Sequence, residues 1–304
     1  MNDRSHITTE HRNPRSERLD ALAVGEMFDL INSEDATIAS AVAAARGSIC
    51  SAIELVVAAL RSGGRLIYVG AGTSGRLGVL DAAECPPTFL SDPAMVQGVI
   101  AGGAEALTRS VEGAEDRPED GAAAIDQREV GENDVVFGIA TGGTTPFVHG
   151  ALGRARQRRA KTVFLACVPV NQVADEADVS IRVVTGPEVV TGSTRMKAGT
   201  ATKMVLNMVT TIAMVRLGKV YQNLMVDVNT KSNAKLVDRG MRILQMVTGA
   251  SREEARSLLD AADGHVKTAL VMHARQVDRT TAERLLRDAD GFVNRVIETR
   301  REID

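Results

Sequence analysis

The chain has 304 residues, of which 44% are hydrophobic and 25% are charged. This composition is typical of a globular protein with one large domain, or with one large and one small domain. The formal net charge of −3 gives no reason to expect nucleic acid or an anionic membrane as a partner. Aromatic residues make up only 3% of the chain and tryptophan is absent, which argues against base-stacking platforms.

The cysteines and the apolar stretches indicate a cellular compartment. Cys50, Cys85 and Cys167 are an odd, scattered set without metal-ligand spacing, so a reducing compartment fits best. The N-terminus is polar and charged and does not resemble a signal peptide. Polar residues interrupt the most apolar long stretch, 204–217, which predicts a buried helix and not a membrane span. We therefore expect a cytoplasmic protein.

The first 62 residues predict an arm and two helices. Residues 1–17 are polar and are expected to form an N-terminal arm, and their composition favours a disordered tail. Helical apolar spacing follows over 19–32. A longer, alanine-rich amphipathic helix is expected over 35–62, ended by the two glycines that follow.

A strand, a glycine-rich turn and a helix are expected between Arg65 and Pro87. Leu66–Val69 is a short run of strand-forming residues, and the turn Gly70–Gly75 follows it. Helix-compatible residues then continue to Cys85, where two prolines are expected to end the helix. Free N–H groups at such a helix start, together with the helix dipole, favour a bound phosphate.

Glu84 lies at the opposite, negatively polarised end of this predicted helix. An ionised carboxylate is disfavoured there, and shielding from water would favour the protonated form further. Such a carboxyl group is suited to act as a general acid. The segment is thus expected to bind a phosphate and to supply a proton donor.

The middle of the chain alternates between apolar runs and helical patterns. Further strands are expected over 95–101, 134–140, 162–168 and 179–184, with helices from about residues 105, 146 and 194. This pattern predicts an α/β fold, a doubly wound, mostly parallel five-stranded sheet with N-terminal helices. Ligands of such sheets bind at the carboxyl ends of the strands.

From residue 233 the pattern is helical only and predicts a small C-terminal all-helical subdomain. Ser251 begins a capping-box sequence in that region. The expected domains are therefore the arm, 1–17, a main ligand-binding domain with its N-terminal helices, 18–232, and the helical subdomain, 233–304.

The loop after the first strand matches the pattern G-x-G-x-x-G, so a dinucleotide site has to be considered. The second strand ends in Gly102-Gly103, without the acidic residue that grips a ribose. Gly72, Thr73 and Ser74 favour a compact phosphate instead. A tight turn without a ligand remains the alternative for this loop.

Two more loops carry hydroxyl groups. Thr141, Thr144 and Thr145 surround two glycines after the third strand, and two such loops in one sheet indicate a phosphorylated small molecule. The third loop, 186–203, has hydroxyl groups and basic side chains at a helix start, which suit an anion or a sugar. Its candidates are Ser193, Thr194, Arg195 and Lys197. A helix cap at Ser193 or Thr194, with the basic residues in solvent, is the alternative.

The candidate acids are Glu84, Glu112, Glu115 and Asp116, of which the last three also suit a solvated surface. The five histidines lack metal-ligand spacing, and no Ser-His-Asp set is apparent. His11 and His149 could lie near a site or on the surface. The histidines therefore give no reason to expect a metal site.

Three segments together resemble one family. Residues 70–87, 111–116 and 186–203 closely resemble those of N-acetylmuramic acid 6-phosphate etherases, which are sugar isomerase (SIS) domain proteins related to the glucokinase regulatory protein. The third segment is shared with that regulatory protein, and the first two select the etherases. The family often reads Ala-Ser-Gly-Arg-Thr-Pro where this chain has Thr141-Gly142-Gly143-Thr144-Thr145-Pro146, so a serine and an arginine are missing.

The resemblance implies a cytoplasmic homodimer that cleaves the lactyl ether of N-acetylmuramic acid 6-phosphate without metal or organic cofactor. It implies Glu84 as the general acid/base and Glu115 as the second active-site glutamate. The alternatives are a phosphosugar isomerase and a non-enzymatic sugar-phosphate sensor of the same fold. A nucleotide-dependent oxidoreductase is a more distant alternative.

Overall fold

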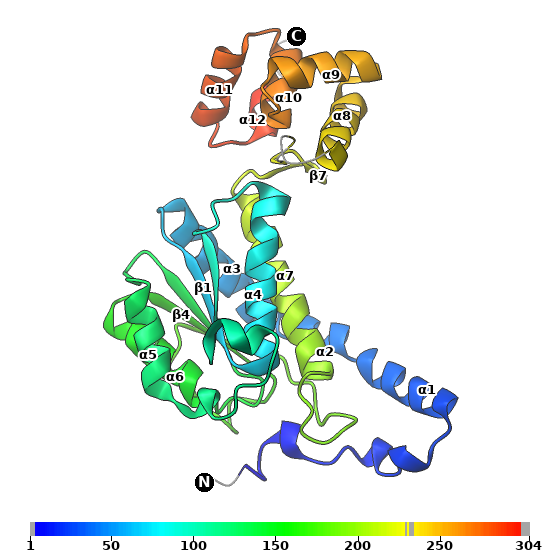
Figure 1. The fold of residues 1–304 in the computed structure, drawn as a ribbon, viewed down its shortest axis with the longest axis vertical. Helices are drawn as coiled ribbons and strands as arrows, with labels where there is room; N and C mark the ends of the chain where they lie inside the picture. The colour runs from blue at the N-terminus through cyan, green and yellow to red at the C-terminus, as the bar shows by residue number, and fades with distance from the viewer. Residues whose placement is uncertain (1–3, 229, 231–233, 299–304) are drawn as a thin grey trace. The chain divides into compact units, whose positions relative to one another are not determined.

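The five expected strands form one parallel sheet in the computed structural model of the chain, which describes residues 4–228, 230 and 234–298 (Figure 1). The strand order is β2-β1-β3-β4-β5. The sheet therefore confirms the predicted α/β fold. Its strands are β1 (Leu66–Gly70), β2 (Val96–Ile100), β3 (Val135–Ile139), β4 (Lys161–Ala166) and β5 (Val179–Arg182).

The strand order reverses at β1, which pairs with β2 on one side and with β3 on the other. Gly70, the last residue of β1, is in register with Ile100 of β2 and Ile139 of β3. The loops after these three strands therefore leave the sheet at the same level. An edge of this kind, beside a switch in strand order, is the usual ligand position in an open parallel sheet.

Helices bury both faces of the sheet because the side chains of a strand alternate between faces. Ile67, Val69 and Val136 share an apolar cluster with the buried face of α6 (Pro146–Gln157). The helix α5 (Pro118–Gln127) packs closely on α6, since a Cβ at Gly121 would lie 2.0 Å from the Phe147 carbonyl oxygen. The apolar face of α3 (Arg46–Arg61) contacts β5, β1 and β3.

Three helical predictions were wrong in their limits. The expected helix 35–62 is divided into α2 (Ile38–Ala44) and α3 by a bend at Ala45, which neither glycine nor proline marks. Before them, α1 (Val24–Asp35) begins later than expected. The helix α4 (Gly72–Phe89) passes through Pro86 and Pro87. Both prolines lie in its last turn, and the Leu90 N–H still donates to the Pro86 carbonyl oxygen at 2.9 Å.

The expectation of a disordered N-terminal tail is wrong for residues 4–17. Short 3₁₀ helices form at η1 (Thr8–Glu10) and η2 (Pro14–Ser16), and a third, η3 (Leu19–Ala21), precedes α1. Ile7 is 1% exposed and belongs to the apolar cluster under α6. One large apolar side chain therefore anchors a segment that is otherwise polar.

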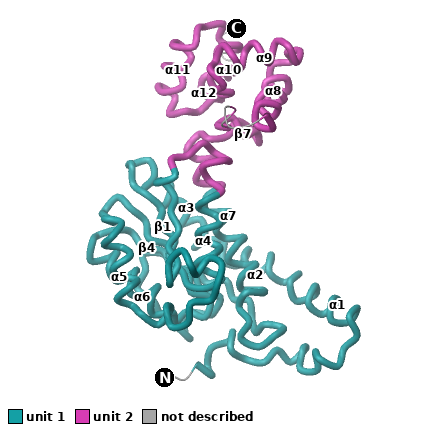
Figure 2. The backbone as a smooth tube through the Cα atoms, in the orientation of Figure 1, with its two compact units in different colours: residues 1–83, 93–210 teal, residues 84–92, 211–304 magenta. Residues whose placement is uncertain are grey.

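The chain divides into two compact units, 1–83 with 93–210 and 84–92 with 211–304 (Figure 2). The helices α4 and α7 (Lys197–Arg216) contribute residues to both units. The first unit contains the sheet, the short helices η4 (Gly103–Leu107) and η5 (Ala114–Asp116), and the arm. The domain boundary expected between residues 232 and 233 lies outside the described residues.

The second unit is mainly helical and has its own apolar cluster. The predicted capping box is confirmed, since Ser251 Oγ accepts from the Glu254 N–H at 3.2 Å and Glu254 accepts from the Ser251 N–H at 2.7 Å. A small antiparallel pair, β6 (Val220–Tyr221) with β7 (Leu224–Met225), was not predicted. The helices are α8 (Ala234–Thr248), α9 (Arg252–Ala261), α10 (Val266–Arg275), α11 (Arg279–Asp288) and α12 (Val293–Ile297).

No single helix in the described ranges is long and apolar enough to cross a membrane. The bent pair Val24–Ala44 and Arg46–Arg61 reaches the length and composition of a span only when its two parts are taken together. Six apolar side chains of α3 are buried in the folded protein, so its apolar face is already covered by the sheet.

Candidate active site

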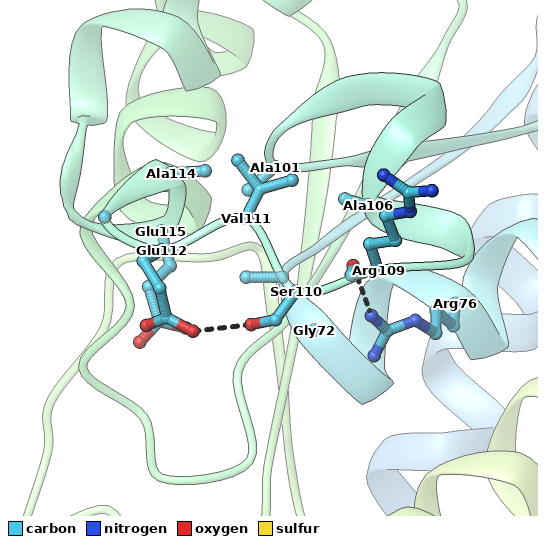
Figure 3. Close-up of a pocket in the computed structure, with 12 residues that line it drawn as sticks. Gly72, Arg76, Ala101, Ala106, Arg109, Ser110, Val111, Glu112, Ala114 and Glu115 are labelled. Atoms are coloured by element: carbon cyan, nitrogen blue, oxygen red, sulfur yellow. Dashed lines mark hydrogen bonds between the residues drawn. The ribbon is translucent and has the colours of Figure 1, made fainter.

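A cavity of about 190 Å³ lies at the carboxyl ends of β1 and β2 (Figure 3). Its wall combines the start of α4 with the segment from η4 to η5, so that it contains two arginines, two glutamates and several small residues. The lining residues are Ala71, Gly72, Arg76, Ala101, Ala106, Arg109, Ser110, Val111, Glu112, Gly113, Ala114 and Glu115.

The predicted glycine turn is the first turn of a helix, because α4 already begins at Gly72. The first N–H groups of a helix have no acceptor within it, so those of Gly72, Thr73 and Ser74 can serve an anion. Gly75 allows this turn to lie against the sheet, since a Cβ there would be 2.6 Å from Ile100 Cγ1 and 2.8 Å from the Gly70 carbonyl oxygen. Close packing thus fixes a helix start with unpaired N–H groups at the switch point.

Arg76 and Arg109 bring positive charge to the cavity, and sequence reasoning missed both. Arg76 donates from Nε to the Leu107 carbonyl oxygen at 3.2 Å and from a terminal nitrogen to that of Arg109 at 3.0 Å. This side chain therefore holds the segment after β2 against α4. The sequence signal is an arginine in the first two turns of the helix that follows the glycine-rich loop, but its partners are backbone atoms of a distant segment.

Glu112 and Glu115 line the same cavity, opposite the two arginines in the view of Figure 3. Both are exposed. The Ser110 hydroxyl donates to Glu112 Oε1 at 2.7 Å and orients that carboxylate. Glu115 follows Gly113, whose φ of +75° turns the chain into η5. Of the predicted acids, the structure thus brings Glu112 and Glu115 together with the start of α4.

The threonine loop follows β3, directly beside the start of α4 in strand order. His149 Nε2 lies 2.7 Å from the Gly143 carbonyl oxygen. The ring therefore donates a hydrogen bond to this carbonyl group and fixes the loop. Thr145 is the N-cap residue of α6, and its side chain accepts no hydrogen bond from the free N–H groups of that helix. Thr141, Thr144 and Thr145 are half-buried, so this loop offers hydroxyl groups and a second uncapped helix start.

The start of α7 differs from the starts of α4 and α6, because the carboxylate of Glu188 already accepts hydrogen bonds from its first N–H groups. Glu188 is completely buried and accepts from the N–H groups of Lys197 and Ala198 at 3.0 and 2.9 Å. Burial raises the pKa of Glu188, and these two N–H groups oppose the shift. Glu188 thus takes the cap position that was considered for Ser193 or Thr194, both of which are half-buried.

The Lys197 ammonium is also occupied. It lies 2.6 Å from Glu34 Oε2, and neither side chain is more than 8% exposed. Asn13 and Arg15 of the arm also bond to Glu34, at 2.9 and 2.6 Å. Burial favours the neutral form of the Glu34 carboxyl group. The hydrogen bond and the charge of Lys197, the hydrogen bond of Asn13 and the charge of Arg15 outweigh burial and hold the pKa of Glu34 below its ordinary value. Lys197 therefore stabilises the loop that carries Ser193 and Thr194.

Glu84 is exposed and belongs to the second unit. It follows Gly72 by twelve residues within the continuous helix α4, and this separation corresponds to about 18 Å along a helix axis. The shielding from water that was expected for the Glu84 carboxyl group is not provided within one chain. One turn earlier, buried Asp81 accepts from Tyr68, Asn207 and Thr210 at 3.0, 2.8 and 3.2 Å. Asp81 thus attaches α4 to β1 and α7.

Other chemistry has little support at this edge of the sheet. Cys167 follows β4, but burial and the charge of Glu188 raise the pKa of its thiol to about 12, so it does not supply a thiolate nucleophile. Within the described ranges, no group of three histidine, cysteine or acidic side chains could hold a metal ion. His11 is exposed at the surface, where its Nε2 donates to the Ser5 carbonyl oxygen at 2.9 Å.

A parallel sheet with hydroxyl loops at its switch point is the arrangement of a SIS domain. Residues 118–212 match the SIS domain model, and residues 48–156 match that of the glucokinase regulatory protein N-terminal SIS domain. Residues 244–273 of the second unit match a UBA-like domain. A solved phosphoheptose isomerase from Neisseria gonorrhoeae is 17% identical, covers 63% of this chain and 98% of its own, and has a TM-score of 0.49.

Curated relatives are much more similar over nearly the whole chain. The N-acetylmuramic acid 6-phosphate etherases of Crocosphaera subtropica and Gloeothece citriformis are 56% and 57% identical, each over 96% of this chain and 95% of its own. That of a Nostoc species is 56% identical over 98% of this chain and 96% of its own. The chain belongs to the N-acetylmuramic acid 6-phosphate etherase family.

Proposed function

We propose that the protein is a carbon–oxygen lyase that cleaves the lactyl ether of N-acetylmuramic acid 6-phosphate, in the recycling of cell-wall amino sugars in the cytoplasm. The products are N-acetylglucosamine 6-phosphate and D-lactate. The observation that carries this proposal is the identity of 55–57% to etherases over nearly the full chain. Cys50, Cys85 and Cys167 form no disulfide bonds, which agrees with a reducing compartment.

The phosphate is placed at the start of α4, between the loops that follow β1 and β3. Its ligands in this proposal are the N–H groups of Gly72 and Thr73, the hydroxyl groups of Thr73 and Ser74, and the threonines of the second loop, Thr141, Thr144 and Thr145. Ser193 and Thr194 are placed at the sugar, and Lys197 acts by fixing their loop. Binding the phosphate, which does not react, orients the reacting carbons.

The chemistry is an elimination followed by a hydration. Opening of the sugar ring gives an aldehyde, which acidifies the proton on C2. A base removes that proton while the C3–O bond breaks, and an acid gives its proton to the departing lactate oxygen. Water then adds to the unsaturated aldehyde, its oxygen at C3 and a proton at C2. One carboxyl group that first donates and later accepts a proton can serve both stages.

We assign the donor and acceptor role to Glu84 and the abstraction of the C2 proton to Glu115. Glu115 lines the cavity that contains Gly72, which supports its place beside a bound phosphosugar. Glu84 lies more than three helical turns after Gly72 in the same helix. That separation exceeds the few covalent bonds between the phosphate and the C3 oxygen of one sugar. We therefore propose a homodimer in which a second copy supplies Glu84.

The exposed apolar side chains support such a dimer. Val24 and Phe28 of α1 are 83% and 66% exposed, and they lie one turn apart on the same helix face. A second copy that covered the Glu84 end of α4 would also remove water from that carboxyl group. The partners in this proposal are thus a phosphosugar and a second copy of the chain.

The experiment is incubation with N-acetylmuramic acid 6-phosphate in water enriched in oxygen-18, followed by mass analysis of both products. We expect the label in the C3 hydroxyl of the sugar, because water adds at that carbon. Label in the lactate would mean cleavage on the other side of the ether oxygen and would contradict the assigned roles. Saturable binding without lactate would identify a sensor, and an isomerised sugar would identify an isomerase.

A further inference from the structure

The N-terminal arm contributes a buried threonine to the edge of the sheet that carries the proposed phosphate site. The two residues that precede Thr9 are both fixed by contacts with the rest of the first unit. Ile7 packs in the apolar cluster with Ala140, Phe164 and Val168. Thr8 donates from its N–H and its hydroxyl to Gln172 Oε1, both at 3.0 Å, and Gln172 Nε2 lies 2.7 Å from the Thr8 hydroxyl. The position of Thr9 is therefore defined by its neighbours.

The Thr9 hydroxyl is buried and has no hydrogen-bond partner among the residues that the structure describes. The residue is 0% exposed. A buried hydroxyl without a partner is unfavourable by comparison with an apolar group of the same shape. Valine, which has that shape, would avoid this cost. The hydroxyl at position 9 is thus disfavoured by the ligand-free fold.

The hydroxyl is directed at the threonine loop. A Cβ built on Gly142 would lie 3.5 Å from Thr9 Oγ1. Apart from Gly142 and its two chain neighbours, no other described residue has an atom within 4 Å of that Cβ position. Gly142 is not among the glycines with positive φ, so its backbone conformation does not require glycine. The missing side chain instead leaves the Cβ position of Gly142 unfilled, directly next to the hydroxyl of Thr9.

We propose that Thr9 is a further residue of the phosphosugar site, and that its hydroxyl donates a hydrogen bond to a phosphate oxygen that enters the space beside Gly142. This inference rests on the proposed function, since it places the phosphate between the loops after β1 and β3. It assigns the arm a direct role in binding. It also explains why an otherwise unfavourable hydroxyl is held in a fixed position.

The first test is Thr9→Val, assayed with inorganic phosphate as a competitive inhibitor and with N-acetylmuramic acid 6-phosphate as substrate. Loss of a hydrogen bond to a charged oxygen is expected to raise the phosphate inhibition constant and KM about ten-fold, with kcat within about two-fold. The thermal midpoint is expected to stay equal or to rise, because an unpaired buried hydroxyl is removed. Thr9→Ser is expected to keep the affinity for phosphate.

The matched control is Ser91→Ala. Ser91 also has a buried hydroxyl without a partner in the described structure, and it does not line the cavity. We expect this variant to leave the phosphate inhibition constant unchanged. The inference is wrong if Thr9→Val also leaves the phosphate inhibition constant unchanged. It is equally wrong if this variant weakens phosphate binding only in proportion to a lowered thermal midpoint, because Thr9 then has a structural role.

Gly142→Ala tests the same space from the opposite loop, without altering the arm. Its methyl group would occupy the space beside the Thr9 hydroxyl at ordinary contact distance, so the fold is expected to persist while phosphate binding weakens. Unchanged phosphate binding in this variant would contradict the inference. Failure of the proposed function would look different, because the unaltered protein itself would then release no lactate.

Discussion

The ammonium of Lys197 lies 2.6 Å from Glu34 Oε2, and the two side chains are 4% and 8% exposed. Replacing Lys197 by methionine would leave Glu34 buried without its main partner. We expect the free energy of unfolding to fall by about 3–5 kcal/mol, measured by urea denaturation. Arg195→Met, an exposed change two residues away, is the control and is expected to stay within about 0.5 kcal/mol.

The acid dependence of stability provides a second prediction. The pKa of Glu34 is lowered in the folded protein, so its contribution to stability is present above the ordinary value of 4.5. That contribution is lost as the pH falls through the lower, folded value. The difference in thermal midpoint between the unaltered protein and Glu34→Gln should therefore narrow below pH 4.5. Glu188, whose raised pKa acts in the opposite direction, is common to both proteins and cancels in this comparison.

A methyl group at Gly75 is expected to disturb the start of α4. It would lie 2.6 Å from Ile100 Cγ1 and 2.8 Å from the Gly70 carbonyl oxygen, closer than packed atoms allow. We expect Gly75→Ala to cost about 1–3 kcal/mol in stability and to raise KM. Gly47→Ala is the control, because a Cβ there meets nothing within 4 Å, and it should stabilise the protein by about 0.4–1 kcal/mol.

The fold was predictable where the signal was local. The strand β1 is a short apolar run that is buried throughout, and a glycine-rich helix start follows it directly. The bend at Ala45 was not predictable, since no residue type marks it. The continuation of α4 through Pro86 was missed because proline has no N–H to donate within a helix and is therefore expected to end it.

The site was predictable only in part, for a similar reason. Glycines and threonines after two strands indicate an anion site from local sequence, because parallel strands end at one edge. The pairing of Lys197 with Glu34 depends on residues 163 positions apart, so the sequence could not distinguish a buried structural lysine from a ligand. The buried position of Thr9 likewise depends on the distant residues that surround it.

The proposed division of the site between two copies predicts complementation. Glu84→Gln and Glu115→Gln are each expected to abolish lactate release while the protein still binds phosphosugar. In mixed dimers, one of the two sites would combine an intact Glu115 with an intact Glu84 from the other copy. Random pairing of the co-expressed variants should then restore about a quarter of the unaltered activity in a twofold dimer.

Separately tagged subunits allow the mixed dimers to be purified and assayed alone. The control is each variant purified by itself, which should remain inactive at the same concentration. Mixed dimers without activity would mean that both glutamates act within one chain, or that one of the two assignments is wrong.

The attachment of Thr8 to Gln172, 164 positions later, also bears on how the protein is made. The arm cannot take its final place until β4 and the loop behind it have been synthesised. Contacts of such long range close a large loop and form slowly. The arm is therefore expected to dock among the last steps of maturation, so that a nascent chain gains its complete ligand-binding edge only after most of the sheet is assembled.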